Sequence, residues 1–178
     1  MKKSLICFLL VLVLTAGVLF GLSFGLQKLA ATNAQQAHLQ LMQTLLPGSE
    51  TFVIEPYSGE DGNIRSVHKG ENGFVIETAT RGYADEIRVL VGVSNDGKVT
   101  GLVIQEMHET LGLGFAALTD WQFLAQFLNT KGDAEVGTNV DAVAGATVTS
   151  KAIARCVNSA VAYVTGADAD SGATSWGG

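Results

Sequence analysis

The sequence predicts an α+β protein in which an N-terminal transmembrane helix precedes one domain with an antiparallel sheet and flanking helices. The first observation behind this prediction is an uncharged apolar run from Leu5 to Leu26. The second is a pair of β-prone runs, Ile87–Ser94 and Val99–Met107, around a turn containing Asp-Gly, which supplies the positive φ angles of a tight hairpin. The third is a stretch of apolar residues at helical spacing from Ile153 to Val164.

Length and composition exclude several classes of protein. A chain of 178 residues has room for one hydrophobic core and a short appendage. Its formal net charge of −6, with basic residues scattered singly, excludes a nucleic-acid-binding surface, which needs clustered Lys and Arg. Cys7 and Cys156 stand far apart and cannot hold an iron–sulfur cluster, which usually takes four thiolates. If the protein carries electrons, it uses another cofactor.

The apolar run from Leu5 to Leu26 contains 22 residues, about the length that a helix needs to cross the bilayer core. Lys2 and Lys3 precede it, and the remainder of the chain is acidic overall. The positive-inside tendency therefore places residues 1–4 in the cytoplasm and the domain on the extracytoplasmic side of the cell membrane. A cleaved signal peptide is the alternative, but its apolar region is usually shorter, so the length favours a single-pass anchor.

Residues 27–48 are predicted to form a helical connector, and residues 49–166 the folded domain. Asn33–Leu46 has apolar residues near helical spacing, and Pro47 with Gly48 would end that helix. Three short β-prone runs separated by glycine-containing turns come next, which indicates the start of the sheet. They are Thr51–Glu55, Ile64–Lys69 and Phe74–Thr80.

Two helices are expected after the hairpin. A short one would be capped by Thr119 or Asp120 and would turn its apolar side to the core. The last helix would begin near Thr149 or Ser150 and end at Gly166. On this last helix, the residues expected to face away from the core are Lys151, Arg155 and Asn158.

The segment Asp141–Ser150, which leads into the last helix, is the best candidate for chemistry. Small residues before Thr147 let a ligand approach the backbone, and the unpaired amides and dipole of a helix start favour an anion such as phosphate. Asp141 has the wrong charge for phosphate, so it would hydrogen-bond to a loop or assist the enzyme that modifies Thr147. From the residues alone the plainer interpretation is favoured, in which Thr147, Thr149 or Ser150 only caps the helix.

A resemblance to a known family changes this balance. Asp141–Ser150 reads Asp-Ala-Val-Ala-Gly-Ala-Thr-Val-Thr-Ser and resembles the flavinylation motif of the FMN-binding domain family. In that family a flavin transferase joins the phosphate of FMN to the hydroxyl of the closing threonine, which implies a covalent FMN on Thr147. Glu106–Gly114 resembles the family's Glu-Thr-Pro-Gly-Leu-Gly segment, which also follows a hairpin. Leu111 replaces its proline, and Ala144 stands where Ser or Thr is common.

The resemblance implies a set of cofactor-binding residues and neither a catalytic residue nor a metal ligand. The residues of the second segment would orient the isoalloxazine ring and tune its potential. Those of the motif would hold the phosphate. Besides Thr147, the implied residues are Glu109, Thr110, Leu111, Gly112, Leu113, Gly114, Asp141, Gly145, Ala146, Val148, Thr149 and Ser150.

The C-terminal tail contains a rival acceptor. Residues 167–178 are Gly, Ala, Ser, Thr and Asp with one Trp, a composition typical of a poorly ordered tail. Within it, Asp168–Thr174 repeats the spacing of the motif and supplies the serine that Asp141–Thr147 lacks. No amphipathic helix follows Thr174, so neither a helix dipole nor a packed wall would hold a flavin there. Thr147 is therefore the favoured acceptor.

The chain length and N-terminal anchor resemble those of the G subunits of Rnf (Rsx) electron-transport complexes. In that family the complex passes electrons between reduced ferredoxin and NAD while it moves Na⁺ or H⁺ across the membrane. The resemblance implies an electron-relay subunit that is no enzyme by itself. It implies the other complex subunits, a flavin transferase and the membrane as partners, and no nucleic acid.

Three alternatives remain open at this point. The chain could be the C-subunit-like part of a sodium-translocating NADH:quinone reductase, which shares the domain but is typically longer. It could be a standalone, membrane-anchored extracytosolic flavoprotein that meets soluble donors, although no cluster of acid, base and nucleophile suggests a substrate site. It could also be an anchored binding domain without cofactor, in which Thr147 merely caps a helix.

Overall fold

The computed structural model describes residues 32–106 and 119–167, together with residues 15, 17 and 20. A helix occupies residues 32–45 and crosses the boundary between two units, Met1–Leu41 and Met42–Gly178. Within the described ranges, no helix combines the length and the apolar character needed to cross a membrane. The predicted span, residues 5–26, lies almost entirely outside them.

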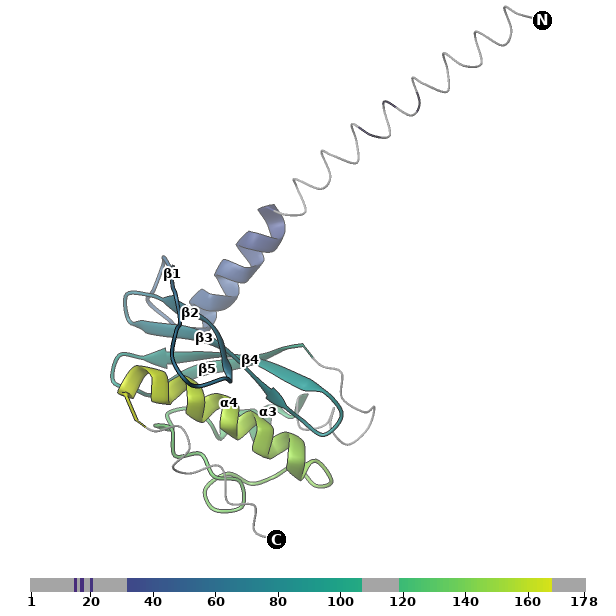
Figure 1. Cartoon of the computed structure of the whole chain (residues 1–178), viewed down its shortest axis with the longest axis vertical. Helices are drawn as coiled ribbons and strands as arrows, with labels where there is room; N and C mark the ends of the chain where they lie inside the picture. Colours follow the sequence, from purple (N-terminus) through teal and green to yellow (C-terminus); the bar gives the residue numbers. More distant parts are fainter. Residues whose placement is uncertain (1–14, 16, 18–19, 21–31, 107–118, 168–178) are drawn as a thin grey trace, which may run out of the picture. The chain divides into compact units, whose positions relative to one another are not determined.

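Five antiparallel strands form a meander in chain order, β1-β2-β3-β4-β5, as Figure 1 shows. The predicted sheet is confirmed, and the hairpin turn has Gly97 at φ 76° as its Asp-Gly dipeptide requires. The Ser94 amide donates to the Lys98 carbonyl (2.9 Å), and the Lys98 amide donates to the Ser94 hydroxyl (3.2 Å), which closes this turn. The strands are β1 Val53–Glu55, β2 Ile64–Lys69, β3 Gly73–Arg81, β4 Glu86–Ser94 and β5 Val99–Glu106.

Helix α4, Thr147–Thr165, covers one face of the sheet (Figure 1). The side chains of alternating strand positions meet it, because successive residues of a strand point to opposite faces. On β4 these are Ile87, Val89, Val91 and Val93, all fully buried. Of the apolar positions predicted on α4, Ile153, Val157 and Val161 are buried, and Val164 is half-buried against the core. The main core of the domain therefore lies between the sheet and α4.

The opposite face of the sheet packs against residues 42–46 at the end of the first helix. Gly92 alternates with the core residues of β4, and a Cβ placed on it would lie 2.2 Å from the carbonyl oxygen of Leu45. The hydroxyl of Thr100 donates a hydrogen bond to that same carbonyl. Met42, Leu45 and Leu46 are buried here. Because Gly92 has no side chain, the backbone at Leu45 can lie directly against the sheet.

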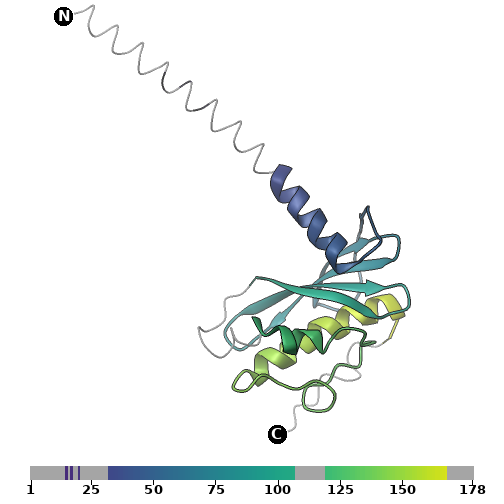
Figure 2. The same cartoon turned by 180° about the vertical axis from the view of Figure 1, so that it is seen from behind.

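A third layer packs beside α4 and bonds to the start of β5 through Asn129 and Thr130. It comprises the short helix α3, Trp121–Ala125, and the chain that follows it to residue 140, seen from both sides in Figures 1 and 2. The Asn158 side chain donates to the carbonyl of Ala134 (2.9 Å) and accepts from its amide (3.1 Å). The prediction that Asn158 faces away from the core was wrong, since this layer buries it. Arg155 is half-buried, and only Lys151 of the three is exposed.

The ends of α4 differ from the prediction at one terminus only. The helix begins at Thr147, two or three residues before the predicted start at Thr149 or Ser150, with Ala146 as its N-cap. It ends as predicted, with Gly166 in the left-handed conformation at φ 70° and its amide bonded to the carbonyl of Ala162. The chemistry-bearing segment is therefore a short loop, Asp141–Ala146, and the first turn of α4. We call Asp141–Ala146 the acceptor loop.

Candidate functional site

The N-terminus of α4 has no side-chain cap among the described residues. Ala146 occupies the N-cap position, and its side chain has no oxygen that could accept a bond from the first amides of the helix. The short helix α3 is different, because the carboxylate of Asp120 accepts from the amides of Gln122 (2.9 Å) and Phe123 (3.2 Å). The first amides of a helix have no carbonyl partner within it, and the dipole of a long helix is positive at this end. The start of α4 is thus open to an anion.

Three hydroxyl-bearing residues in the first turn of α4 have three different environments. Thr147 is exposed, and among the described residues none bonds to its hydroxyl. Thr149 is buried, and within the described chain its hydroxyl oxygen also lacks a hydrogen-bond partner. Ser150 is fully buried and committed to the loop: its hydroxyl donates to the carbonyl of Ala146 (2.9 Å) and accepts from the amide of Val143 (3.3 Å). Of the three, Thr147 is the one that offers its hydroxyl to solvent.

The acceptor loop is held at both ends. At its C-terminal end, Gly145 takes φ 77°, a conformation that favours glycine, and the amide of Ala146 donates to the carbonyl of Val143 (2.9 Å). At its N-terminal end, the side-chain carbonyl of Gln126 accepts from the amide of Asp141 (2.8 Å). The Gln126 amide nitrogen lies 3.4 Å from the Asp141 carbonyl oxygen. Sequence reasoning missed Gln126, because nothing in the chain indicates a contact across 15 residues.

The surface around Thr147 is small and mixed in polarity. The loop residues Ala142, Ala144 and Gly145 are exposed and leave the hydroxyl open, and Val148 beside it is 38% exposed. Asp141 is exposed and held through its backbone rather than its carboxylate. Lys151 is exposed one turn after Thr147, on the same helix face, and helical side chains lean towards the N-terminus. A lysine at this spacing can supply positive charge near an anion on Thr147, and sequence reasoning did not assign Lys151 this role.

The second predicted segment, Glu109–Gly114, lies outside the described residues. The described chain stops at Glu106, and the register of the sheet pairs Glu106 with Arg88 near the start of β4. The C-terminal end of α4 lies at the β4–β5 turn, where a Cβ on Gly97 would meet Thr165. The start of α4 therefore lies away from that turn. Glu106 and the start of α4 therefore lie towards the same end of the sheet.

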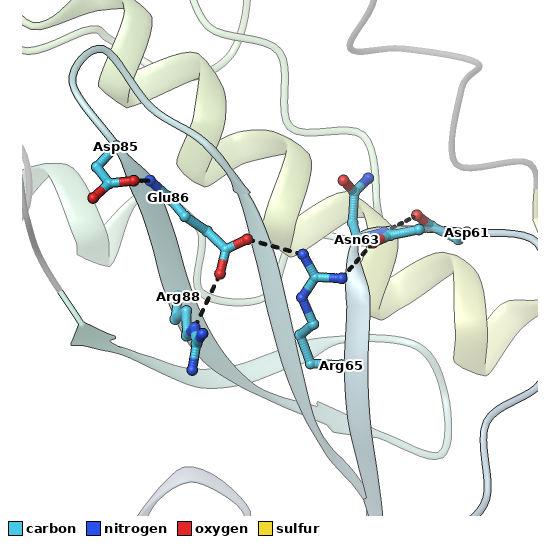
Figure 3. Close-up of polar contacts among 7 residues, drawn as sticks. Asp61, Asn63, Arg65, Asp85, Glu86 and Arg88 are labelled. Atoms are coloured by element: carbon cyan, nitrogen blue, oxygen red, sulfur yellow. Dashed lines mark hydrogen bonds and ion pairs between the residues drawn. The ribbon is translucent and has the colours of Figure 1, made fainter.

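A polar network at this end of the sheet is structural in character. The Glu86 carboxylate accepts from Arg65 of β2 (2.9 Å) and from Arg88 of β4 (3.0 Å), as Figure 3 shows. These bonds, first that of Arg88 and then that of Arg65, lower the pKa of Glu86. All three side chains are partly exposed, and the single Glu86 carboxylate is shared by two guanidinium groups. The network thus joins β2 to β4 through side-chain bonds.

The described residues contain no cluster of His, Cys, Asp and Glu that could hold a metal ion. Cys156 lies on α4 within the core, fully buried. Burial raises the pKa of its thiol from 9.0 to about 12, although a hydrogen bond with Thr78 partly opposes the shift. It is therefore a core residue and not a nucleophile.

The first turn of α4 fits a phosphate ester. An exposed hydroxyl, uncapped helix amides and a nearby lysine offer a covalent attachment point, hydrogen-bond donors and compensating charge. The buried hydroxyl of Thr149, which has no partner among the described residues, lies in the same turn. The small residues of the acceptor loop keep the approach to the backbone clear.

Comparison with known proteins agrees with this chemistry. Residues 82–162, from the β3–β4 turn through most of α4, match the FMN-binding domain family. The chain is 39% identical, over 50% of its length and 47% of the relative's, to the G subunit of a Na⁺-translocating ferredoxin:NAD⁺ oxidoreductase complex of Acetobacterium woodii. It is 34% identical to the G subunit of an ion-translocating oxidoreductase complex of Methanosarcina acetivorans, over 70% of this chain and 73% of the relative.

A third relative is covered more completely. It is the G subunit of the ion-translocating oxidoreductase complex of Escherichia coli O157:H7, 31% identical over 80% of this chain and 82% of the relative. The matched part thus spans about half of the Acetobacterium protein and most of the other two. The likeness extends well beyond the segment that contains Thr147.

Proposed function

This chain belongs to the G-subunit family of ion-translocating oxidoreductase complexes, and from that premise we propose that it is an electron-relay subunit of a membrane-bound ferredoxin:NAD oxidoreductase (Rnf) complex. Its FMN-binding domain makes FMN the cofactor. We further propose that the FMN is bonded covalently, through its phosphate, to the hydroxyl of Thr147.

One observation carries the assignment of Thr147. The 19-residue helix α4 starts at this residue without a side-chain cap from the described chain, whereas the five-residue α3 has a carboxylate cap. A long helix with an open N-terminus favours an anion there by its amides and its dipole. The exposed Thr147 hydroxyl is the first nucleophilic group at that position. The cofactor-free alternative, in which Thr147 caps the helix, is disfavoured because Ala146 holds the cap position.

The residues of this chain would hold and orient the cofactor. The amides of the first turn of α4 and the Lys151 ammonium group would bind the phosphate, and Val148 would offer an apolar contact. Glu109–Gly114, which carries the family's second motif, is proposed to contact the ring. A bound flavin supplies transfer of electrons, and the protein sets its potential by hydrogen bonds, charge and burial. A covalent bond would make retention independent of affinity.

The proposal places the FMN domain outside the cytoplasm. Leu5–Leu26 would anchor the chain in the cell membrane, with Lys2 and Lys3 inside. The other subunits of the complex would deliver and remove electrons, and a flavin transferase would attach the FMN. The chain alone would be a redox carrier without an enzymatic activity of its own. The names of its relatives support this role, since they mention ion translocation and, for the Acetobacterium protein, ferredoxin and NAD⁺.

The test is to co-express the full chain with a flavin transferase and to view a denaturing gel under ultraviolet light. The wild-type band is expected to fluoresce, because a covalent flavin survives denaturation. Thr147→Ala should abolish the fluorescence, since the acceptor hydroxyl is gone. Thr147→Ser keeps a hydroxyl at the same place and should retain a signal.

Thr174→Ala is the matched control in the tail copy of the motif. It should leave the fluorescence unchanged. A wild-type band that stays dark would remove the covalent assignment altogether. Loss of signal in Thr174→Ala, with Thr147→Ala still fluorescent, would move the acceptor to the tail.

A further inference from the structure

We propose that Gln126 is a positioning residue of the FMN site: its side-chain amide fixes the first residue of the acceptor loop and thereby the place in which the flavin is held. The inference rests on the proposed function, because it takes Thr147 as the attachment point. Gln126 itself lies outside the motif, 15 residues before Asp141.

The side-chain amide of Gln126 bonds to both backbone groups of Asp141, as a neighbouring strand would. Its oxygen accepts from the Asp141 amide at 2.8 Å, and its nitrogen donates towards the Asp141 carbonyl at 3.4 Å. The first bond has good length, and the second is at the long limit. Both go to backbone atoms, so they constrain the path of the loop whatever the Asp141 side chain does.

The main chain that carries Gln126 is firmly placed. Phe123 and Phe127, on either side of it, are buried in the core and pack edge to face with ring centroids 5.2 Å apart. Aromatic pairs of this kind add to the energy gained from burial. Gln126 is half-buried between these anchors. The amide is therefore fixed in space by the core and can in turn fix the loop.

The acceptor loop has little packing of its own. Ala142, Ala144 and Gly145 are exposed, and the partly buried Val143 packs against the core cluster. The bonds of Ser150 hold the end of the loop next to α4. Those of Gln126 hold its beginning. Hydrogen bonds to two different parts of the fold, more than apolar contacts, thus define the course of this loop.

Removal of the Gln126 side-chain amide should change how the flavin is oriented but not whether it is attached to Thr147. Thr147 belongs to α4, whose start is held by Ser150, so its hydroxyl remains available to a flavin transferase. The Asp141 end of the loop, however, would be released. The flavin would then still be attached, but its surroundings would become less ordered.

The experiment compares Gln126→Leu with Gln122→Leu in the full chain co-expressed with a flavin transferase. Gln122 lies on the nearby short helix and is exposed, and no described residue bonds to its side chain, so it controls for the substitution itself. Gln126→Leu should keep the wild-type yield of fluorescent band on a denaturing gel. Its visible circular dichroism, which reports the asymmetry around the flavin, should weaken to roughly half or less, and its Asp141 amide should exchange about tenfold faster.

Gln126→Glu supplies the conservative rescue. Its carboxylate can still accept from the Asp141 amide, the shorter of the two bonds, so most of the circular dichroism should return. If the leucine variant does not fold, Gln126→Asn replaces it with the same expectations, because its amide is one methylene too short to reach.

A circular dichroism spectrum of Gln126→Leu equal to that of the wild type and of Gln122→Leu would overturn the proposal. So would complete loss of the flavin from a folded Gln126→Leu chain, because the residue would then act in attachment. Failure of the proposed function would give a different result. Either the wild-type chain would carry no flavin, or the Thr147→Ala chain would still carry one.

Discussion

At the scale of single residues, the first turn of α4 shows how position decides the use of a hydroxyl group. Thr147 is exposed, Thr149 is buried without a partner in the described chain, and Ser150 holds the loop by two hydrogen bonds. A sequence motif presents these residues as equivalent. The helical rotation of about 100° per residue separates them, because it turns neighbours to different sides. Of the three, the first is therefore the one available for modification.

Cys156 gives a prediction at the same scale. Burial raises its pKa to about 12, so in the folded protein at pH 8 the thiol should react with iodoacetamide at least about 100-fold more slowly than in the denatured chain. A Cys7→Ser background makes Cys156 the sole thiol. The measurement is the rate of alkylation by mass spectrometry with and without denaturant. Equal rates in the two states would contradict the buried placement.

The raised pKa of Cys156 also predicts how the stability of the folded protein changes with pH. A thiol whose pKa is raised on folding favours the folded state while it is protonated in both states, which holds below the ordinary value of 9.0. As the pH rises from 9 towards 12, the unfolded chain loses this proton first. The contribution therefore disappears at alkaline pH, and Cys156→Ala should lessen the alkaline loss of stability. Urea denaturation at a series of pH values measures the free energy of unfolding. If this free energy fell equally at alkaline pH in the variant and the wild type, the raised pKa of Cys156 would be contradicted.

At the scale of elements, the sheet followed from the sequence with little ambiguity. The hairpin turn, the alternation of apolar residues in β4 and the glycine after α4 are local signals, and each of them reports its own backbone conformation. The start of α4 and the burial of Asn158 did not follow. The first was missed because Ala146 is an unfavoured cap, which no propensity suggests.

Tertiary contacts explain the other failures of sequence reasoning. Asn158 is polar, yet the layer formed by residues 121–140 covers it, and Ala134 in that layer satisfies both groups of its amide. Gln126 meets Asp141 only because the fold brings the two segments together. Lys151 has the pattern of a solvated charge, and its relation to Thr147 becomes meaningful only because α4 begins at Thr147. Periodicity cannot report such contacts.

Gly92 tests the packing of residues 42–46 against the sheet. Replacing it with Ala places a methyl group against the Leu45 carbonyl oxygen, which is a backbone atom and cannot rotate away. We expect the free energy of unfolding to fall by about 1–3 kcal/mol, the usual cost of overpacking. Thermal denaturation followed by circular dichroism measures it. Gly62→Ala is the control, because a Cβ there meets no atom within 4 Å, and an equal loss in both variants would contradict this packing.

At the scale of the whole molecule, the proposed arrangement is a tethered carrier. The folded domain offers the open start of α4 for the flavin, and the apolar run of residues 5–26 would keep the domain at the membrane. In the proposal, a covalent cofactor and a membrane anchor would serve one purpose, since they would keep an electron carrier near the subunits that charge and discharge it. This arrangement depends on the side of the membrane on which the domain lies.

The side of the membrane can be tested with reporters fused to the C-terminus. A fused alkaline phosphatase, which needs an oxidising compartment to fold its disulfides, should be active. A fused fluorescent protein that folds only in the cytoplasm should be dark. Reversal of both results would place the FMN domain in the cytoplasm and contradict the orientation inferred from Lys2 and Lys3.

Tryptic peptide mapping of the wild-type chain tests whether the FMN is attached to Thr147. Cleavage after Lys131, Lys151 and Arg155 separates residues 132–151, which contain Thr147, from residues 156–178, which contain Thr174. A missed cut at Lys151 gives residues 132–155 and keeps the two threonines apart. We expect the mass and absorbance of FMN on the peptide with Thr147, with fragment ions assigning it to that residue. Flavin on residues 156–178 alone would contradict it.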